Sequence, residues 1–78
     1  MVLRLGPPPG ARWVFVGLSA IAVFAGKVTL VDGDDSKLVS AGHLALVGDP
    51  SATLYLEAGN DSALAIALAE PGFVAALS

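Results

Sequence analysis

Turn signals recur at short intervals along the chain, and this spacing constrains the fold more than any other feature of the sequence. Clusters of Gly, Pro, Asp, Asn or Ser occur at 6–10, 32–35, 40–42, 48–51, 58–61 and 70–72. Between these clusters lie short runs in which large apolar residues alternate with small or polar ones, and no run has the period of an amphipathic helix. The spacing predicts an all-β fold with almost no helix, a barrel or sandwich of about seven to nine short antiparallel strands.

The clearest alternation occurs in the run "TLYLE" at 53–57. Leu54 and Leu56 occupy every second position, so both should point into the core while the residues between them point outward. The run "KVTLV" at 27–31 places Val28 and Leu30 on one face in the same way. Both runs predict half-buried strands.

The stretch "SALAIALAE" at 62–70 combines two opposing signals. Alanine favours a helix, but a helix would place Ile66 on the side opposite Leu64 and Leu68, leaving no single apolar stripe. We therefore predict a strand over 62–69, followed by a turn at 70–72 and a final strand at 73–77. The alanines of this strand form its other face, where small side chains suit close packing against another layer or another subunit.

Two loop motifs have both a structural and a functional interpretation. The prolines of "GPPPG" at 6–10 cannot donate ladder hydrogen bonds, so we interpret the segment as a connector rather than as a proline-rich ligand. The run "DGDD" at 32–35 could offer carboxylates to Ca²⁺, but the EF-hand pattern would need Gly and Glu where Lys37 and His43 stand. Asp-Gly between two strands predicts a hairpin instead.

Size and composition indicate that the chain does not act alone. Its 78 residues form one small domain over 1–78, without Cys for disulfides or thiolate zinc sites, and 55% of the residues are hydrophobic. Because a lone chain of this size is marginally stable, we expect part of that apolar surface to close against another copy of the chain. The residues predicted at this interface are Trp13, Tyr55, Ala63, Ala65 and Ala67, the two aromatic residues because they fall on outward positions.

Charge and hydropathy argue against a nucleic-acid-binding protein and against a helix that spans a membrane. The net charge is −3, and the four basic residues are scattered singly, so nucleic-acid binding is not expected. The uncharged run at 13–26 is too short to span a bilayer as a helix. Its end, Val23-Phe24-Ala25 before Gly26, resembles the cleavage site of a secretory leader, which is one alternative. We expect an uncleaved chain in a cytoplasmic setting, with a virion-type or secreted setting as alternatives.

The order of strands and turns between Val23 and Gly72 resembles a known family. The runs "VFAGKVTL", "LVSAGHLALVG" and "TLYLEAGNDSALAIALAEPG" are similar to the small cupin barrel, most closely to the C-terminal cupin half of the pirin family. The resemblance implies a jelly-roll-like barrel. Metal-binding cupins use a His-x-His pair, a Glu and a later His, and the matching segment from Arg12 to Ser19 contains neither residue type. The resemblance therefore implies no metal site and no cofactor here.

His43 is the single imidazole, so any His-dependent reaction would have to use it. Asp49 with Ser40 or Ser51 could complete a triad, but spacing alone does not establish one. We expect no catalytic residue and interpret the chain as a non-enzymatic, cupin-like module for oligomerisation or binding. Two alternatives stay open: a small apolar ligand in the barrel interior, and a structural, virion-type component that assembles through the alanine face at 63–69.

Overall fold

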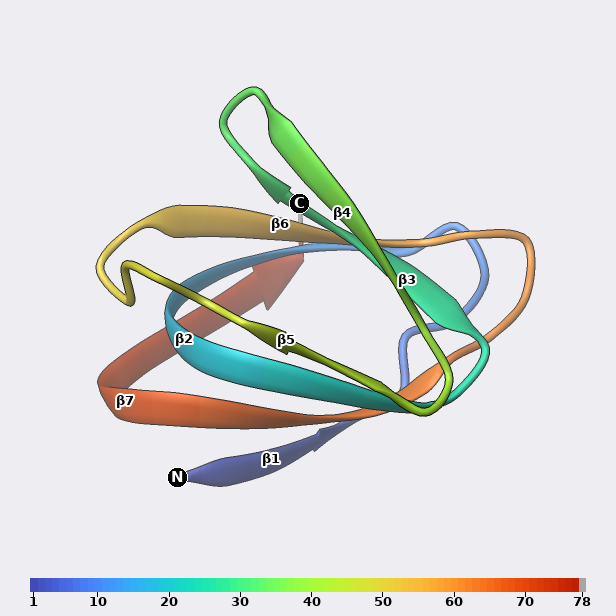
Figure 1. Ribbon diagram of the computed structural model, residues 1–78, viewed down its shortest axis with the longest axis horizontal. Coiled ribbons are helices and arrows are strands. Elements are labelled where there is room, and N and C mark those ends of the chain that lie inside the picture. The colour runs from blue at the N-terminus through green and yellow to red at the C-terminus, as the bar shows by residue number, and fades with distance from the viewer. Residues whose placement is uncertain (78) are drawn as a thin grey trace.

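The computed structural model describes residues 1–77, and of Leu77 only the backbone. These residues contain seven strands and no helix, which confirms the all-β prediction (Figure 1). The strands are β1 (Val2–Leu5), β2 (Arg12–Ala25), β3 (Lys27–Asp32), β4 (Asp35–Ser40), β5 (His43–Leu46), β6 (Thr53–Ala58) and β7 (Leu64–Leu77). Every pairing between them is antiparallel.

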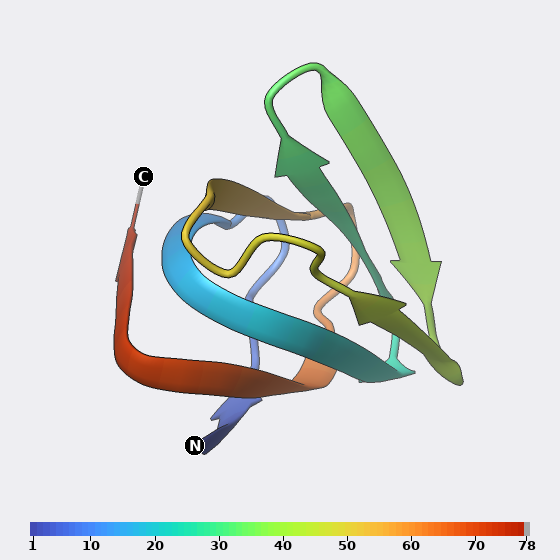
Figure 2. The ribbon, with the colours of Figure 1, turned by 60° about the vertical axis from the view of Figure 1, so that its left-hand side comes forward.

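The long strands β2 and β7 hold the sheet together because each takes part in two layers. The first half of β2 pairs with β6, and its second half pairs with β5, while β7 runs beside it along both halves. The strand order is β1-β7-β2-β6-β3-β4, with β5 as a second neighbour of β2. Both strands curve strongly, so the sheet wraps around its own inner face (Figure 2). We call β1, β5 and the adjoining halves of β2 and β7 the first layer, and β3, β4, β6 and the remaining halves the second layer.

Two glycines allow close approach where the sheet bends. Gly17 has φ 92°, its N–H donates to the Pro50 carbonyl at 2.8 Å, and an added Cβ would lie 3.1 Å from the Phe73 Cα. Gly26 has φ 70°, and a Cβ there would lie 2.6 Å from the Ser62 carbonyl oxygen. A side chain at either position would strain the backbone and collide with a neighbouring segment.

The inner sides of the two layers form one core, and β7 differs from the other long strand, β2, in contributing only small side chains from Ala65 to Ala69. The second layer contributes large residues, and those predicted to point inward do so: Val28, Leu30, Leu54 and Leu56 are buried. Phe15, on the same layer, is fully buried and stacks on Phe73 with ring centroids 5.5 Å apart. The first layer contributes Leu18, Ile21 and Val23 from β2 together with the alanines of β7, which are described below.

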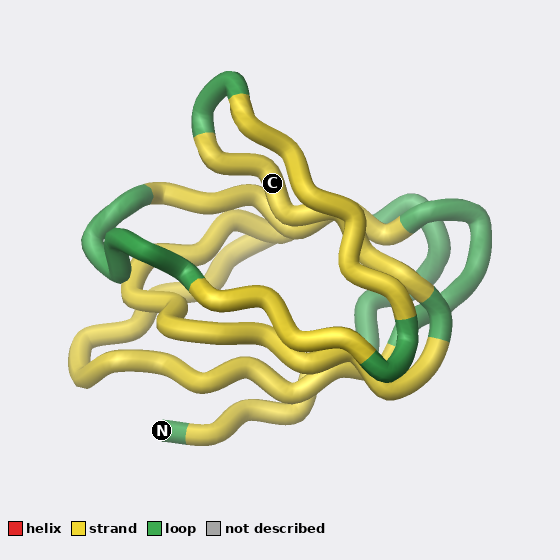
Figure 3. Tube along the Cα trace, viewed as in Figure 1, coloured by secondary structure: helices red, strands yellow, loops and turns green. Residues whose placement is uncertain are grey.

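The turn predictions are confirmed at five of the six sites and wrong at the sixth. Loops or turns occur around 6–11, 33–34, 41–42, 47–52 and 59–63 (Figure 3). Residues 70–72 do not end a strand, because β7 continues through Pro71 and Gly72 with a shift in its register against β2. Proline and glycine are tolerated at such an irregular point of a ladder, where the strand bends rather than stops.

Candidate interaction surface

The alanines of β7 face the core of their own chain. Ala65 and Ala67 are fully buried and Ala63 is 7% exposed. Since they pack against the opposite layer, their side chains are not available to another chain. The interface prediction for Ala63, Ala65 and Ala67 is therefore wrong, and so is the expectation of an assembly contact through this face. Of the two alternatives for small side chains, packing against another layer is the one that the fold uses.

The large residues of β7 consequently face outward, where they join apolar side chains of three neighbouring strands. Register places these side chains in rows across the first layer. One row runs Leu46, Ala20, Leu68, Val2 from β5 to β1, and the next runs Leu44, Ala22, Ile66, Arg4. Phe24 and Leu64 lie at the end of β2 and the start of β7. We call the apolar members of this set the leucine face: Val2, Ala20, Ala22, Phe24, Leu44, Leu46, Leu64, Ile66 and Leu68.

The leucine face is large for a chain of this size. Its six most exposed members range from 42% exposure at Leu64 to 72% at Leu46. Together they present roughly 600 Å² of apolar surface, at the upper end of the about 300–600 Å² found for the largest patch of a typical monomer. The charged groups at its border are Arg4, on the outermost strand, and Glu70, which accepts a hydrogen bond from Ser19 Oγ at 2.8 Å.

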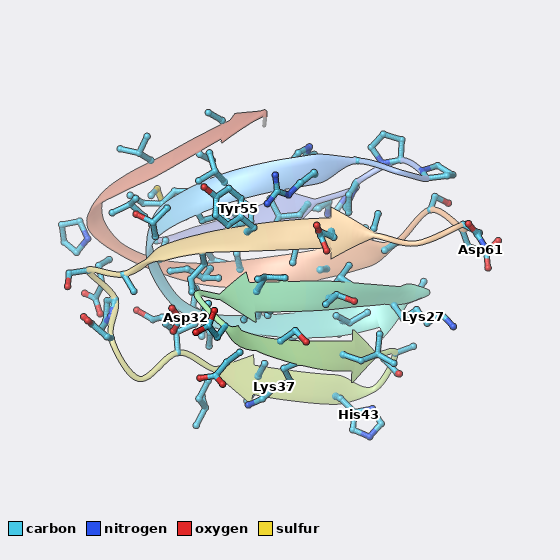
Figure 4. All side chains as sticks on the ribbon, turned by 90° about the horizontal axis from the view of Figure 1, so that it is seen from above. Lys27, Asp32, Lys37, His43, Tyr55 and Asp61 are labelled. Atoms are coloured by element: carbon cyan, nitrogen blue, oxygen red, sulfur yellow. The ribbon has the colours of Figure 1, made fainter. Side chains whose placement is uncertain are left out.

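The outer side of the second layer has a different character, and we call it the mixed face. Arg12 Nε lies 3.1 Å from a Glu57 carboxylate oxygen, and the Arg12 guanidinium lies over the Tyr55 ring at 4.2 Å. Thr29 and Thr53 continue this face on β3 and β6. Tyr55 is thus on the outward side, as predicted, and is labelled there in Figure 4. Its cross-strand neighbours are Val14 and Val31, so this face combines charged, hydroxyl and apolar side chains.

Trp13 was assigned to the outward side by the sequence, and the structure places it on the inner side. It packs against the core and meets Phe15 edge-on, with ring centroids 6.1 Å apart. Its Nε1 atom is buried without a hydrogen-bond acceptor in the described part of the chain. The outward assignment failed because Trp13 and Phe15 are two positions apart on one strand and so share a face. Trp13 therefore contributes to the core.

A cleft opens at the end of the β3–β4 hairpin. It has a volume of about 370 Å³ and exists because β4 pairs with β3 alone and β5 with β2 alone. Buried Leu30 and Leu54 line it together with Leu46 and Val47 from β5 and the following loop. The hairpin end adds polar groups, including Asp32 and Lys37, both labelled in Figure 4. The space lies beside the packed core rather than within it.

The residues considered for catalysis are not brought together. His43 is exposed at the start of β5, and its imidazole makes no hydrogen bond within residues 1–77. The Asp49 carboxylate accepts hydrogen bonds from the Ser51 hydroxyl at 2.6 Å and the Ser51 backbone N–H at 3.0 Å. These bonds hold the pKa of Asp49 below the ordinary aspartate value. Asp49 and Ser51 therefore form a local turn, without the imidazole that a triad needs.

Acidic and histidine side chains do not gather into a metal-binding group. Within residues 1–77, no three or more His, Asp or Glu side chains are placed to hold one ion together. Asp32 and Asp35 pair across the end of the predicted β3–β4 hairpin, where Gly33 takes φ 60° in the two-residue turn. The described residues also include no helix that could cross a membrane.

The leucine face is the most extensive candidate site, and the alternation of residues in the sequence identified one of its strands. Leu64, Ile66 and Leu68 were recognised as one face of a strand, but their contact with Leu44 and Leu46 depends on the pairing of both strands with β2. No protein family, curated protein or solved structure matches the chain.

Proposed function

We propose that this chain is a non-enzymatic, cupin-like β-barrel module that works by protein–protein contact, and that the leucine face is its working surface. The observation that carries the proposal is the continuous apolar outer side of β5, β2, β7 and β1. Antiparallel sheets with one side in water usually alternate apolar and polar residues. In the first layer, both sides of the strands are apolar.

The energetics favour covering this surface. Burying apolar area contributes roughly 25 cal/mol per Å² before the costs of association are subtracted. Contiguous exposed patches of this size typically mark interaction sites. The mixed face lacks this property, because Arg12, Glu57 and Tyr55 already interact with one another there.

Binding of the dye bis-ANS tests whether the leucine face is open to contact. At high dilution, where assemblies dissociate, the wild type should bind the dye strongly. The double variant Leu44→Ser/Leu68→Ser should lose most of that fluorescence, since both side chains belong to the leucine face and neither lines the cleft. The matched variant Val14→Ser/Val31→Ser changes outward valines near the mixed face and should retain it. Equal dye binding by all three proteins would overturn the proposal, provided that circular dichroism shows all three folded.

The cleft supports a second candidate function, the binding of a small apolar ligand. Its volume of about 370 Å³ falls at the lower end of ligand sites, and its floor is apolar. Titration with hexanol, followed by NMR, should shift the signals of Leu30, Val47 and Leu54 in a saturable manner. Non-saturable shifts, or shifts confined to the leucine face, would contradict ligand binding in the cleft.

A further inference from the structure

We propose that the occupant of the leucine face is a second copy of this chain, packed face to face about a two-fold axis parallel to the strands. This inference rests on the proposed function, because it requires the leucine face to be a contact surface. The resulting contact would be isologous, with the same residues used by both copies. The position of the two-fold axis follows from the pattern of large and small side chains on the leucine face.

The face has ridges separated by a furrow. Ala20 lies between Leu46 and Leu68, and Ala22 lies between Leu44 and Ile66. Alanine side chains on β2 therefore form a furrow between a ridge on β5 and a ridge on β7. Ala20 is only 3% exposed and Ala22 is partly buried, so the furrow is narrow at Ala20 and more open at Ala22. A furrow beside a ridge of similar length is a self-complementary surface.

A two-fold axis between β2 and β7, parallel to both, brings the β7 ridge of each copy onto the β2 furrow of the other. The rotation sets β7 of one copy over β2 of the other, and each cross-strand row of residues meets the same row in the other copy. Leu68 of one copy then lies over Ala20 of the other, and Ile66 lies over Ala22 of the other. The same rotation sets β5 of each copy over β1 of the other. An axis perpendicular to the strands would instead place ridge on ridge.

The area of the face is compatible with this occupant, and the arrangement keeps like charges apart. Arg4 is on the outermost strand β1, so the two-fold sets the Arg4 residues of the two copies at opposite rims, each over Leu44 of the other copy. Each copy would contribute roughly 600 Å² of apolar surface, so the two copies would together bury about 1,200 Å², the lower limit of specific protein–protein interfaces.

A mixing experiment with two single variants tests the arrangement. Leu68→Ala lowers the ridge, and Ala20→Leu fills the furrow. Each variant alone should dissociate at least about tenfold more readily than the wild type, the first by leaving a cavity and the second by overpacking. A mixture should form heterodimers in preference to either homodimer, because each altered ridge then meets an altered furrow. Native mass spectrometry resolves the three species, and sedimentation equilibrium measures their dissociation constants.

The outcomes separate this inference from the proposed function. A wild-type chain that remains monomeric at high micromolar concentration would overturn the second copy as occupant, even where bis-ANS binding still marks the leucine face as a contact surface. A wild-type dimer whose two variants mix at random would overturn the two-fold arrangement. Val31→Ala, on the mixed face, is the control and should leave the dimer dissociation constant unchanged. Circular dichroism and thermal unfolding confirm that each variant is folded.

Discussion

The leucine face and the mixed face differ although both are outer sides of the same sheet. On the mixed face, an ion pair, a cation–π contact and threonines stand among outward valines and the exposed Leu38 and Val74. On the leucine face, the outward positions hold leucine, isoleucine, valine and phenylalanine. The curvature of β2 brings one strand into both environments. The comparison shows that one outer side of this small barrel mixes charged and apolar side chains, whereas the other presents rows of exposed aliphatic side chains.

The inner sides of both layers are apolar, and they differ at β7. Behind the mixed face stand large core residues such as Phe15 and Leu54, whereas behind the leucine face Ile21 and Val23 of β2 stand beside the alanines of β7. Stacked sheet layers lie about 10 Å apart, so the large residues already in the core leave room for only small ones on β7. β7 therefore places its small residues inside and its large residues outside.

The largest effect is expected from removing a large core side chain behind the mixed face. Leu54→Ala should lower the free energy of unfolding by about 2–5 kcal/mol, because it deletes buried contacts and leaves a cavity. Thr53→Ala, on the outward side of the same strand, is the control and should change it by less than about 0.5 kcal/mol. Urea denaturation measures both values. Similar losses for the two variants would contradict the assignment of inner and outer sides on β6.

A smaller loss is expected from enlarging a small residue behind the leucine face. Ala67→Leu should destabilise the monomer by about 1–3 kcal/mol, since the fully buried position has no room for three more carbon atoms. Ile66→Leu, on the outward side of β7, conserves volume and should cost less than about 1 kcal/mol. Denaturation at a concentration that keeps the chain monomeric isolates these effects. A neutral or stabilising Ala67→Leu would show that the alanine side is not tightly packed.

The two arginines offer a matched test of the outer sides. Arg12→Ala should cost about 0.5–1 kcal/mol, because it removes the ion pair with Glu57 and the contact with Tyr55. Both partners of the ion pair are nearly half exposed, so the loss should shrink as salt screens it. Arg4→Ala, at the border of the leucine face, should leave monomer stability almost unchanged. Equal losses at the two positions would remove this distinction between the faces.

The smallest effect concerns the loop that precedes β6. Ser51→Ala removes the hydroxyl bond to Asp49 and should raise the Asp49 pKa toward its ordinary value. Because the folded-state pKa is depressed, this contribution to stability is present above the ordinary aspartate pKa and is lost as pH falls through the depressed value. NMR titration of the Asp49 carboxyl carbon measures the change. An unaltered pKa in Ser51→Ala would mean that the hydroxyl bond does not stabilise the carboxylate.

Alternation and turn chemistry predicted most of the strands but not the role of every face. The inward positions of Leu54 and Leu56 were correct because polar neighbours marked the opposite side of that strand. The same reasoning could not orient β7, where alanines alternate with larger apolar residues and hydropathy does not distinguish the sides. The turn predicted at 70–72 was wrong because pairing with β2 carries the backbone through Pro71 and Gly72. Pairing over a long distance in sequence is invisible to local signals.

The sequence by itself determined the class of this protein: short alternating strands, turns at Gly and Asp, and a high content of apolar residues. Only the tertiary structure decided which side of β7 faces the core and which residues of distant strands lie together. The physical reason is volume. Large side chains of both layers, such as Phe15, Leu54 and Ile21, fill the interior, the alanines of β7 fit beside them, and the leucines of β5 and β7 are left on the outer surface.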